Sequence, residues 1–287
     1  MKKKIKWSIS IIFLIILFVW GAQSMQNIMT PAIGVLEIEG SIRDALVYLD
    51  AIKVFEENEH VKAVLVRIDS PGGKVGPSQE IYGALLRLKG KKPVIASMGS
   101  VGASGGYYIA CAADTIFALP GTLTGSIGVI LEFLDVSDGL EMIGVKAESI
   151  TSGALKDSGS PFKEMTDTER EYFMELVSDV HEQFVETVAE TRGLPLETVK
   201  NYADGRAFTG RQACEFGLID KLGGFDEAVE EAKEQAGIPG KVRFIRPEIS
   251  TGILDAIRKM VDVSSPLDLR GTASAFGRLV RIEYRME

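Results

Sequence analysis

The sequence predicts an α/β fold in which helices cover a mostly parallel sheet, and two observations support this. From about residue 32 to residue 235, short apolar runs typical of buried strands alternate with longer amphipathic stretches typical of helices. Turns rich in glycine or proline separate these runs. A repeated order of strand, helix and strand is typical of βαβ units, whose strands run parallel and whose helices pack on the faces of the sheet.

The first half of this pattern contains the clearest strands. A helix at 45–58 has apolar residues at 45, 48, 49, 52 and 55, which share one face at about 3.6 residues per turn. A second helix is expected at 79–88. The strands predicted around these helices are 32–38, 62–68, 93–98, 115–118 and 127–131.

The second half is predominantly helical. We expect a strand that ends at Ile150 and then a long charged helix from about 167 to 191. Shorter helices are predicted at 196–202, 211–216 and 226–235. The last residues, 241–287, have a weak periodicity interrupted by Pro247 and Pro266, and they are interpreted as a C-terminal extension.

The chain begins with a basic tip that is followed by an apolar run. Four lysines within the first six residues precede a run from Trp7 to Ala22. Extended back to Ile5, this run is about as long as a helix that spans a bilayer. Because the lysines lie on its N-terminal side, we expect residues 1–25 to form a cytoplasmic tip and a transmembrane signal-anchor helix. Ala22 and Ser24 resemble a signal-peptidase site, so cleavage and release is the competing interpretation.

Composition excludes several classes of protein. The 287 residues carry a formal net charge of −8, and the basic tip makes the rest of the chain more acidic still. Nucleic acid is therefore not an expected partner, because its phosphates would be repelled. The sequence has no Cys-x-x-Cys or His-x-x-x-His spacing, and no metal or other cofactor is expected. Cys111 and Cys214 lie in apolar or helical surroundings, where free thiols are commoner than a disulfide.

The strongest candidate for chemistry is Ser104, in the segment Gly102-Ala103-Ser104-Gly105-Gly106. A strand-like run precedes it and a helix-like run follows, so we expect an exposed serine at the positive end of a helix. Glycine-flanked serines are also common in ordinary turns. The segment fits the Gly-x-Ser-x-Gly elbow of α/β-hydrolases, for which His181 is the one histidine downstream. His60 and His181 are the only histidines of the chain, so a neutral lysine is the alternative base.

Two further loops hold residues suited to hydrolysis. Asp69-Ser70-Pro71-Gly72-Gly73 follows a predicted strand, at the end where parallel sheets bind ligands. Backbone N–H groups of consecutive glycines can stabilise an oxyanion, although Pro-Gly turns are common without any function. The second loop, at 151–161, places Lys156 among small residues, where most lysines are solvated and inert.

Together these segments resemble motifs of bacterial signal peptide peptidase A in its short form. Four motifs carry the resemblance and follow the order of that family: Asp69 to Gly73, Ala103 to Tyr108, Leu123 to Val129 and Ser152 to Asp157. Segments at 207–210, 217–220 and 222–224 are similar as well. The resemblance covers roughly residues 32 to 235 and leaves out the C-terminal extension.

The resemblance implies a serine endopeptidase with a Clp protease/crotonase-like fold, in which residues 26–240 form the protease domain. Ser104 matches the nucleophile of the family, Lys156 its general base and Ser126 a hydroxyl that holds the lysine in place. The oxyanion hole is matched by N–H groups of Gly105 and of Gly72 or Gly73.

The resemblance also implies a setting. It indicates a single-pass protein of the bacterial inner (plasma) membrane, with the catalytic domain on the extracytoplasmic side and the bilayer as a partner of the N-terminal helix. Copies are expected to form a homo-oligomeric ring in which adjacent subunits supply the serine and the lysine of one site. Cleaved signal peptides and other apolar peptides are the expected substrates. Asp157 is expected to face away from Lys156, because a carboxylate against the amine would keep it charged.

Three alternatives come from other classes. A crotonase-type acyl-CoA enzyme shares the fold and the glycine turn, but it needs neither a serine nucleophile nor an anchor. A catalytically silent scaffold would keep the fold for assembly alone. A related membrane protease that acts on stomatin-like partners differs from the first interpretation only in its substrates.

Overall fold

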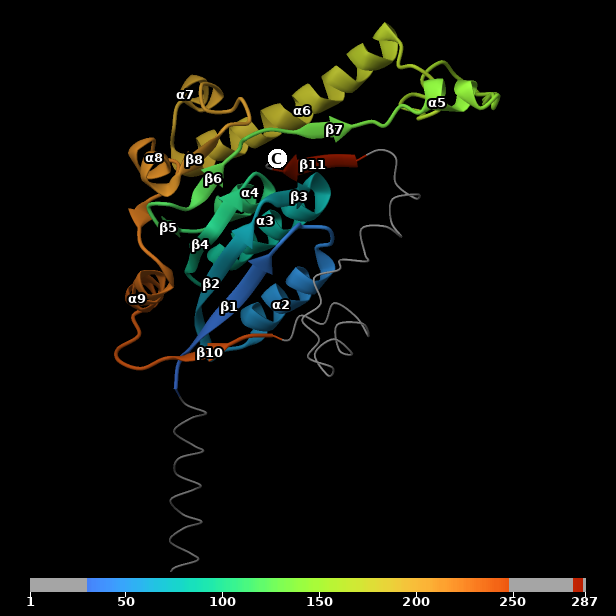
Figure 1. The fold of residues 1–287 in the computed structure, drawn as a ribbon. Helices are drawn as coiled ribbons and strands as arrows, with labels where there is room; N and C mark the ends of the chain where they lie inside the picture. Colours follow the sequence, from blue (N-terminus) through green and yellow to red (C-terminus); the bar gives the residue numbers. More distant parts are fainter. Residues whose placement is uncertain (1–29, 248–280, 286–287) are drawn as a thin grey trace, which may run out of the picture.

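The computed structural model describes residues 30–247 and the C-terminal strand at 281–285 (Figure 1). The expected anchor at 1–25 and most of the expected extension at 241–287 lie outside the described residues. Among the helices that are described, none is both long enough and apolar enough to cross a membrane.

An eight-stranded sheet forms the centre of the fold, with the order β10-β1-β2-β4-β5-β9. In addition, β6 pairs with β4, and β8 pairs with β6. Every pair in it is parallel except β6 with β8. The strands are β1 (Ala32–Glu39), β2 (Val61–Ser70), β4 (Val94–Ala103), β5 (Thr115–Ala118), β6 (Leu123–Gly125), β8 (Ala207–Thr209), β9 (Lys221–Leu222) and β10 (Arg243–Ile245). The predicted α/β class with a mostly parallel sheet is confirmed.

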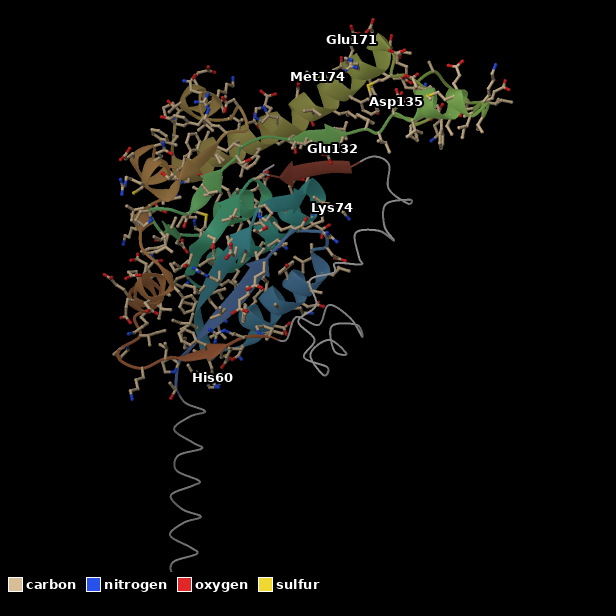
Figure 2. All side chains as sticks on the ribbon, viewed as in Figure 1. His60, Lys74, Glu132, Asp135, Glu171 and Met174 are labelled. Atoms are coloured by element: carbon tan, nitrogen blue, oxygen red, sulfur yellow. The ribbon has the colours of Figure 1, made fainter. Side chains whose placement is uncertain are left out.

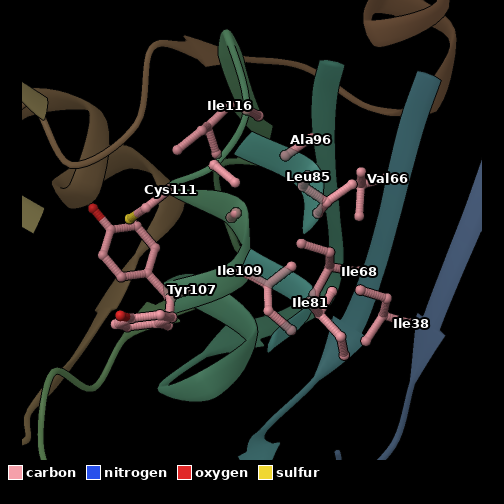
Figure 3. Close-up of a cluster of buried hydrophobic side chains, with 14 of the residues drawn as sticks. Ile38, Val66, Ile68, Ile81, Leu85, Ala96, Tyr107, Ile109, Cys111 and Ile116 are labelled. Carbon is pink, nitrogen blue, oxygen red and sulfur yellow. The ribbon is translucent and has the colours of Figure 1, made fainter. Parts of the chain in front are cut away.

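Helices cover both faces of this sheet, because its central strands are apolar on both sides. In β2, Val64 and Val66 belong to one buried cluster, whereas Ala63 and Leu65 belong to another. The first cluster contains residues of α3 and α4, some of which Figure 3 shows, and residues of α6. The second cluster contains residues of α9. The helices are α2 (Leu46–Glu57), α3 (Val75–Lys89), α4 (Gly105–Ala110), α5 (Ser137–Met142), α6 (Asp167–Arg192), α7 (Leu196–Lys200), α8 (Gly210–Glu215) and α9 (Phe225–Gln235).

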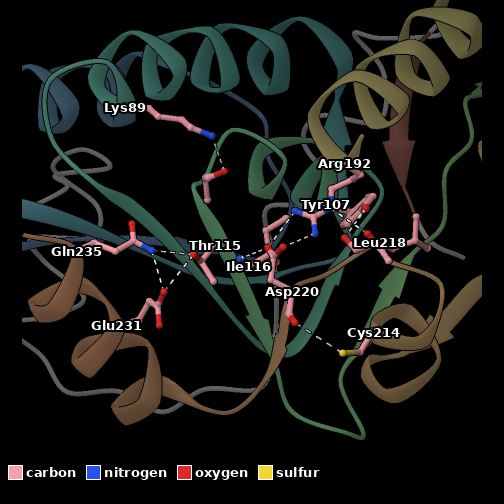
Figure 4. A network of polar contacts seen from close by, with 12 residues as sticks. Lys89, Tyr107, Thr115, Ile116, Arg192, Cys214, Leu218, Asp220, Glu231 and Gln235 are labelled. Atoms are coloured by element: carbon pink, nitrogen blue, oxygen red, sulfur yellow. Dashed lines mark hydrogen bonds and ion pairs between the residues drawn. The ribbon is translucent and has the colours of Figure 1, made fainter. Parts of the chain in front are cut away.

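The C-terminal end of α6 is fixed to the sheet by a polar network (Figure 4). Arg192 donates two hydrogen bonds to the carboxylate of Asp220, at 2.6 and 3.0 Å, and Asp220 also accepts from the N–H of Ile116 in β5. The hydroxyl of Tyr107 in α4 donates to the carbonyl of Leu218 at 2.7 Å. These bonds hold α4 and α6 in fixed positions against β5.

A second, three-stranded sheet has the order β3-β11-β7, from β3 (Gly72–Lys74), β11 (Arg281–Arg285) and β7 (Ile130–Glu132). Beyond β7 the chain continues as an arm, which we define as residues 133–166. Figure 1 shows this arm, which includes α5, extending away from the main sheet. The chain then returns towards the main sheet through α6.

Two expectations about strands differ from the structure. The strand predicted to end at Ile150 is wrong, because residues 145–150 have no regular structure and Ile150 is 98% exposed. An apolar run becomes a strand only where a neighbouring strand accepts its hydrogen bonds. The strand predicted at 127–131 begins later, at Ile130, while the short strand β6 precedes it. The extension contributes β10 to the edge of the main sheet, so its first residues are part of the fold.

Candidate active site

Ser104 lies at the turn between β4 and α4 in a strained backbone conformation. Its φ of 52° and ψ of −118° are rarely adopted by residues other than glycine and cost on the order of 1–3 kcal/mol. Two backbone bonds hold the turn: the Ser104 N–H donates to Gly125 at 2.8 Å, and the Ser104 carbonyl accepts from Tyr108 at 2.8 Å. A sharp turn between a strand and a helix is the geometry that presents a nucleophilic serine.

The side chain of Ser104 is buried without a partner. The residue has no exposed surface, which differs from the exposed serine that the sequence predicts. Its Oγ is one of three buried side-chain polar atoms that lack a hydrogen bond among the described residues. Buried hydroxyls are nearly always bonded, so an unpaired one in a strained turn calls for a functional explanation.

Ser126 repeats the positive φ of Ser104 at the end of the neighbouring strand. It follows β6 as Ser104 follows β4, and the two strands pair in parallel with Ala103 opposite Gly125. The spacing between paired strands, about 4.8 Å, therefore sets the separation of the two serine backbones. Ser126 has φ 49° and is 3% exposed. The structure thus brings together the predicted nucleophile and the predicted second hydroxyl.

The backbone directions of Gly72 and Gly73 differ. The Gly72 N–H donates to Ser70 Oγ at 3.1 Å, and the Gly72 carbonyl accepts from Ile42 at 2.9 Å. The Lys74 N–H also donates to Ile42, at 2.8 Å. Because polar groups alternate sides along a strand, the N–H of Gly73 points away from Ile42, towards β11, where Tyr284 is the register partner of Gly73. Of the two glycines, Gly73 has the N–H that is placed to donate to a ligand.

Gly105 is the first residue of α4, so its N–H has no acceptor within the helix. The α4 backbone also approaches the glycine loop closely: a Cβ on Gly106 would lie 3.0 Å from the carbonyl oxygen of Ser70. The two predicted oxyanion segments therefore lie side by side.

Lys156 lies in the arm and is exposed. Its backbone N–H donates to the carbonyl of Gly153 at 3.1 Å. The neighbouring Asp157 carboxylate lies 4.0 Å from the amine of Lys163, which is the ion-pair partner that the structure gives it. The loop that holds Lys156 is therefore organised by contacts within the arm.

Contacts along α6 separate Lys156 from the two serines. Gly159 packs against Phe173 near the start of α6, whereas Phe184, further along the helix, contacts Tyr108 of α4. Phe173 and Phe184 are eleven residues apart, which corresponds to about 16 Å along the helix axis. Figure 1 shows the residues between α5 and α6 at the far end of the arm from α4. One chain therefore does not bring Lys156 to Ser104.

The two histidines lie in different places. His60 is exposed at the start of β2, and Figure 2 shows it at the end of the molecule opposite the arm, so one chain does not bring it to Ser104. His181 lies on α6 one turn before Phe184, and its Nε2 is buried without a partner. It lines a hollow of about 720 Å³ together with Ser126 and Asp204.

Asp204, which also lines this hollow, is bound by Arg206 and not by His181. The Arg206 guanidinium donates to its carboxylate and holds the pKa of Asp204 at about 2. His181 falls within the long charged helix that the sequence predicts at about 167–191. One feature of the sequence favours His181 as a candidate base. It lies three residues before Phe184, so the two side chains share a helix face.

Comparison with known proteins gives the family. The sequence profile described as "Peptidase family S49" matches residues 87–239. A Synechocystis protein named "Putative protease slr0021" is 46% identical over 212 residues, which are 73% of this chain and 76% of the relative. An Enterococcus faecium protein named "Putative signal peptide peptidase SppA" is 39% identical over 66% of this chain and 55% of its own length.

A plant relative matches over a smaller share of its own length. "Serine protease SPPA, chloroplastic" of Arabidopsis thaliana is 36% identical over 76% of this chain and 32% of the plant protein.

Proposed function

Because this chain belongs to peptidase family S49, in the group with the proteins named SppA, we propose that it is a serine endopeptidase that degrades cleaved signal peptides and other apolar peptides. The observation that carries the proposal is the Ser104 oxygen, which is buried, unpartnered and held in a strained turn. The substrate class follows the name of the Enterococcus relative and the apolar character of signal peptides.

In the proposed reaction, Ser104 Oγ attacks the scissile carbonyl carbon while its proton passes to a neutral amine. The new C–O bond creates an oxyanion, which the N–H groups of Gly105 and Gly73 stabilise. Collapse of this intermediate breaks the C–N bond, and the protonated base gives its proton to the leaving amine. Water then attacks the acyl-serine with help from the same base and restores Ser104.

We propose Lys156 of an adjacent copy as this base. The lysine is exposed in one chain, and contact with a second copy would remove water from its amine and favour the neutral form. Ser126, beside Ser104, can orient the amine without adding charge. This arrangement requires a homo-oligomer whose sites are shared between subunits, and a closed ring satisfies that requirement for every copy.

His181 is a second candidate for the base, because its unpartnered Nε2 lies in the same hollow as Ser126. It would allow one chain to hold the serine and the base together. Asp204 does not complete such a site, since Arg206 already binds its carboxylate.

The membrane tether is a further part of the proposal. The apolar run within residues 5–22 and the lysines before it support an anchor in the bacterial inner membrane, with the catalytic domain on the extracytoplasmic side. Resistance of the expressed full chain to extraction by alkaline carbonate would support this anchor, and release into the soluble fraction would contradict it.

The nucleophile is tested with a fluorophosphonate probe on the full chain in detergent. Mass spectrometry should find the probe on Ser104, and Ser104→Ala should lower hydrolysis of a fluorogenic signal-peptide sequence by at least about 10⁴-fold. Ser97→Ala is the matched control, because Ser97 is equally buried on β4, the strand that leads to Ser104. Labelling of another serine, or an active Ser104→Ala protein, would overturn the assignment.

A further inference from the structure

A carboxylate follows the proposed base directly in the sequence, since Asp157 is the residue after Lys156. Rotation of the Asp157 side chain could therefore bring its carboxylate against the lysine amine. Such a contact would stabilise the charged ammonium, whereas a base must be neutral to accept a proton. Among the described residues, the structure gives Lys156 no ion pair and gives Asp157 a different partner.

That partner is Lys163, which lies between two carboxylates. The Asp157 carboxylate lies 4.0 Å from the Lys163 amine, and 28% of the Asp157 side chain is exposed. The same amine donates to the carboxylate of Glu169 in α6, at 2.6 Å. Lys163 thus connects the loop that holds the proposed base with the first turn of α6.

Glu169 gives this connection a fixed point. Its side chain is 3% exposed and accepts from the N–H of Thr166 at 3.0 Å, within the capping box that begins α6. The hydrogen bond from Lys163 lowers the pKa of Glu169, so this carboxylate is charged at neutral pH. A buried charge requires a partner, and Lys163 supplies it. Lys163 is therefore held in place by α6, independently of Asp157.

The turn that contains Asp157 is fixed by packing. Gly159, two residues further on, has a φ of 72° and packs against the rings of Phe133 and Phe173. These two rings also contact each other, with centroids 4.4 Å apart. The N–H of Ser160 donates to the Asp157 carbonyl at 3.3 Å. The backbone of Asp157 therefore has a defined position relative to α6.

We propose that Lys163 is a positioning residue that binds Asp157 and keeps its carboxylate away from the amine of Lys156. The inference rests on the proposed function for its effect on hydrolysis, since it takes Lys156 as the base. Lys163 acts only through Asp157, and the property that it contributes is its positive charge.

Other charged groups face the same part of the arm. Asp135, which Figure 2 labels, Glu164 and Arg170 line a hollow of about 530 Å³ together with Lys163. The Asp135 carboxylate already accepts from the N–H and the hydroxyl of Ser137, at 2.9 and 2.6 Å. Carboxylates and guanidinium groups keep their charges between about pH 7 and 10. A titration in this range therefore belongs to an amine, which mass spectrometry can assign to one lysine.

Lys163→Gln tests the proposal in the full chain in detergent. Glutamine can still donate a hydrogen bond to Glu169, but it has no charge with which to hold Asp157. The freed carboxylate should raise the pKa of Lys156 by about one unit or more, as an opposite charge within about 4–6 Å does. Labelling with acetic anhydride over a series of pH values, followed by mass spectrometry of the peptide that contains Lys156, measures this pKa without any hydrolysis.

Further variants identify the cause of the shift. Lys163→Gln combined with Asp157→Asn should return the pKa of Lys156 to its wild-type value, and Lys163→Arg, which keeps the charge, should not change it. Lys221→Gln is the matched control, because Lys221 forms an ion pair of 2.7 Å with Glu231 of α9. No shift in the Lys163→Gln protein, or a shift that Asp157→Asn does not reverse, would overturn the inference.

A second protein keeps the test valid if Lys163→Gln alone fails to fold, since that change leaves the buried Glu169 charge unpaired. Lys163→Gln combined with Glu169→Gln leaves neither charge, and glutamine at position 169 can retain the capping box. The same rise in the pKa of Lys156 is expected in this protein, and an unchanged pKa would overturn the inference.

Hydrolysis separates this inference from the proposed function. If Lys156 is the base, the rise of activity with pH should move to higher pH by the same amount in the Lys163→Gln protein. Activity below the pKa should then be about tenfold lower, with an unchanged alkaline plateau, whereas a merely structural defect would lower the plateau. A shift in labelling without a shift in the pH profile of hydrolysis would retain the role of Lys163 and reject Lys156 as the base.

Discussion

The two parts of the candidate site differ in how the chain holds them. Ser104 and Ser126 are 0% and 3% exposed, at the ends of paired strands, with backbone conformations fixed by hydrogen bonds. Lys156 lies in the arm and is exposed. The arm contacts α6 at Phe173, about 16 Å along the helix axis from Phe184, which contacts Tyr108 of α4. The proposed nucleophile is therefore positioned by contacts within one chain, whereas the amine of the proposed base would lose its water only in contact with another surface.

The surface of the arm supports this contrast. Large apolar side chains are exposed there, and surfaces of this kind mark contacts with proteins or membranes. The most exposed are Leu134 at 59%, Met142 at 88%, Ile143 at 72%, Ile150 at 98% and Phe162 at 50%. Strain and burial are thus concentrated at Ser104, whereas the proposed base lies on an exposed, apolar part of the surface.

The largest expected effect comes from replacing each candidate base, Lys156 and His181, in turn. Lys156→Ala should lower kcat/KM by about 10⁴-fold or more, whereas His181→Ala should change it by less than about tenfold. Peptide hydrolysis by the full chain in detergent measures both, and circular dichroism checks folding. The opposite result, an active Lys156→Ala protein and an inactive His181→Ala protein, would place the whole site within one chain.

Displacing the N–H of Gly73, a proposed oxyanion donor, should lower activity by less than replacing the base. A Cβ on Gly73 would lie 2.2 Å from the carbonyl oxygen of Ile42, so Gly73→Ala must displace β3. We expect kcat to fall by about 10²- to 10³-fold, the usual loss for one oxyanion donor. Gly76→Ala in α3 is the control, because a Cβ added there would meet no atom within 4 Å. Equal kcat values for the two variants would remove Gly73 from the oxyanion hole.

These residues also show what the sequence could and could not predict. The glycine-flanked turn at Ser104 and the alternation of strands and helices could be predicted from the sequence, because both depend on local residue types. The matching φ of Ser126 depends on pairing of β6 with β4, and β6 has only three residues, too few for a period. The position of Lys156 could not follow from its neighbours in sequence, since the distance to Ser104 depends on the length and packing of α6.

Mixing two inactive proteins tests whether the two parts of the site come from different copies. Ser104→Ala keeps the lysine and Lys156→Ala keeps the serine, so equal, random co-assembly should make about one site in four complete. Dissociated and reassembled together, the two proteins should recover roughly a quarter of wild-type activity. Confirmed co-assembly without any recovery would place both residues in the same subunit.

The smallest expected effect is on the free energy of unfolding, and it comes from the Cys111 thiol in the core behind Ser104. Burial raises the pKa of the Cys111 thiol to about 11 from an ordinary value of 9.0. The unfolded thiol therefore ionises before the folded one, so its contribution is complete below about pH 9 and is lost as the pH rises towards 11. Between pH 8 and 10 the free energy of unfolding should fall by about 1.4 kcal/mol from this group.

Urea unfolding of the wild-type chain and of Cys111→Ala at both pH values isolates this contribution. Both cysteines are free in the structure, and Cys111 packs in the same cluster as Tyr107 and Ile109 of α4. The pKa of Tyr107 is also raised by burial, so measurements stop at pH 10, before its ionisation in the unfolded chain dominates. The alanine protein should be less stable at pH 8 but lose about 1.4 kcal/mol less between the two pH values. If the free energy of unfolding fell equally in both proteins, the pKa of the Cys111 thiol would not be raised by burial. The core behind Ser104 would then admit water, and it would differ less from the exposed arm than the structure indicates.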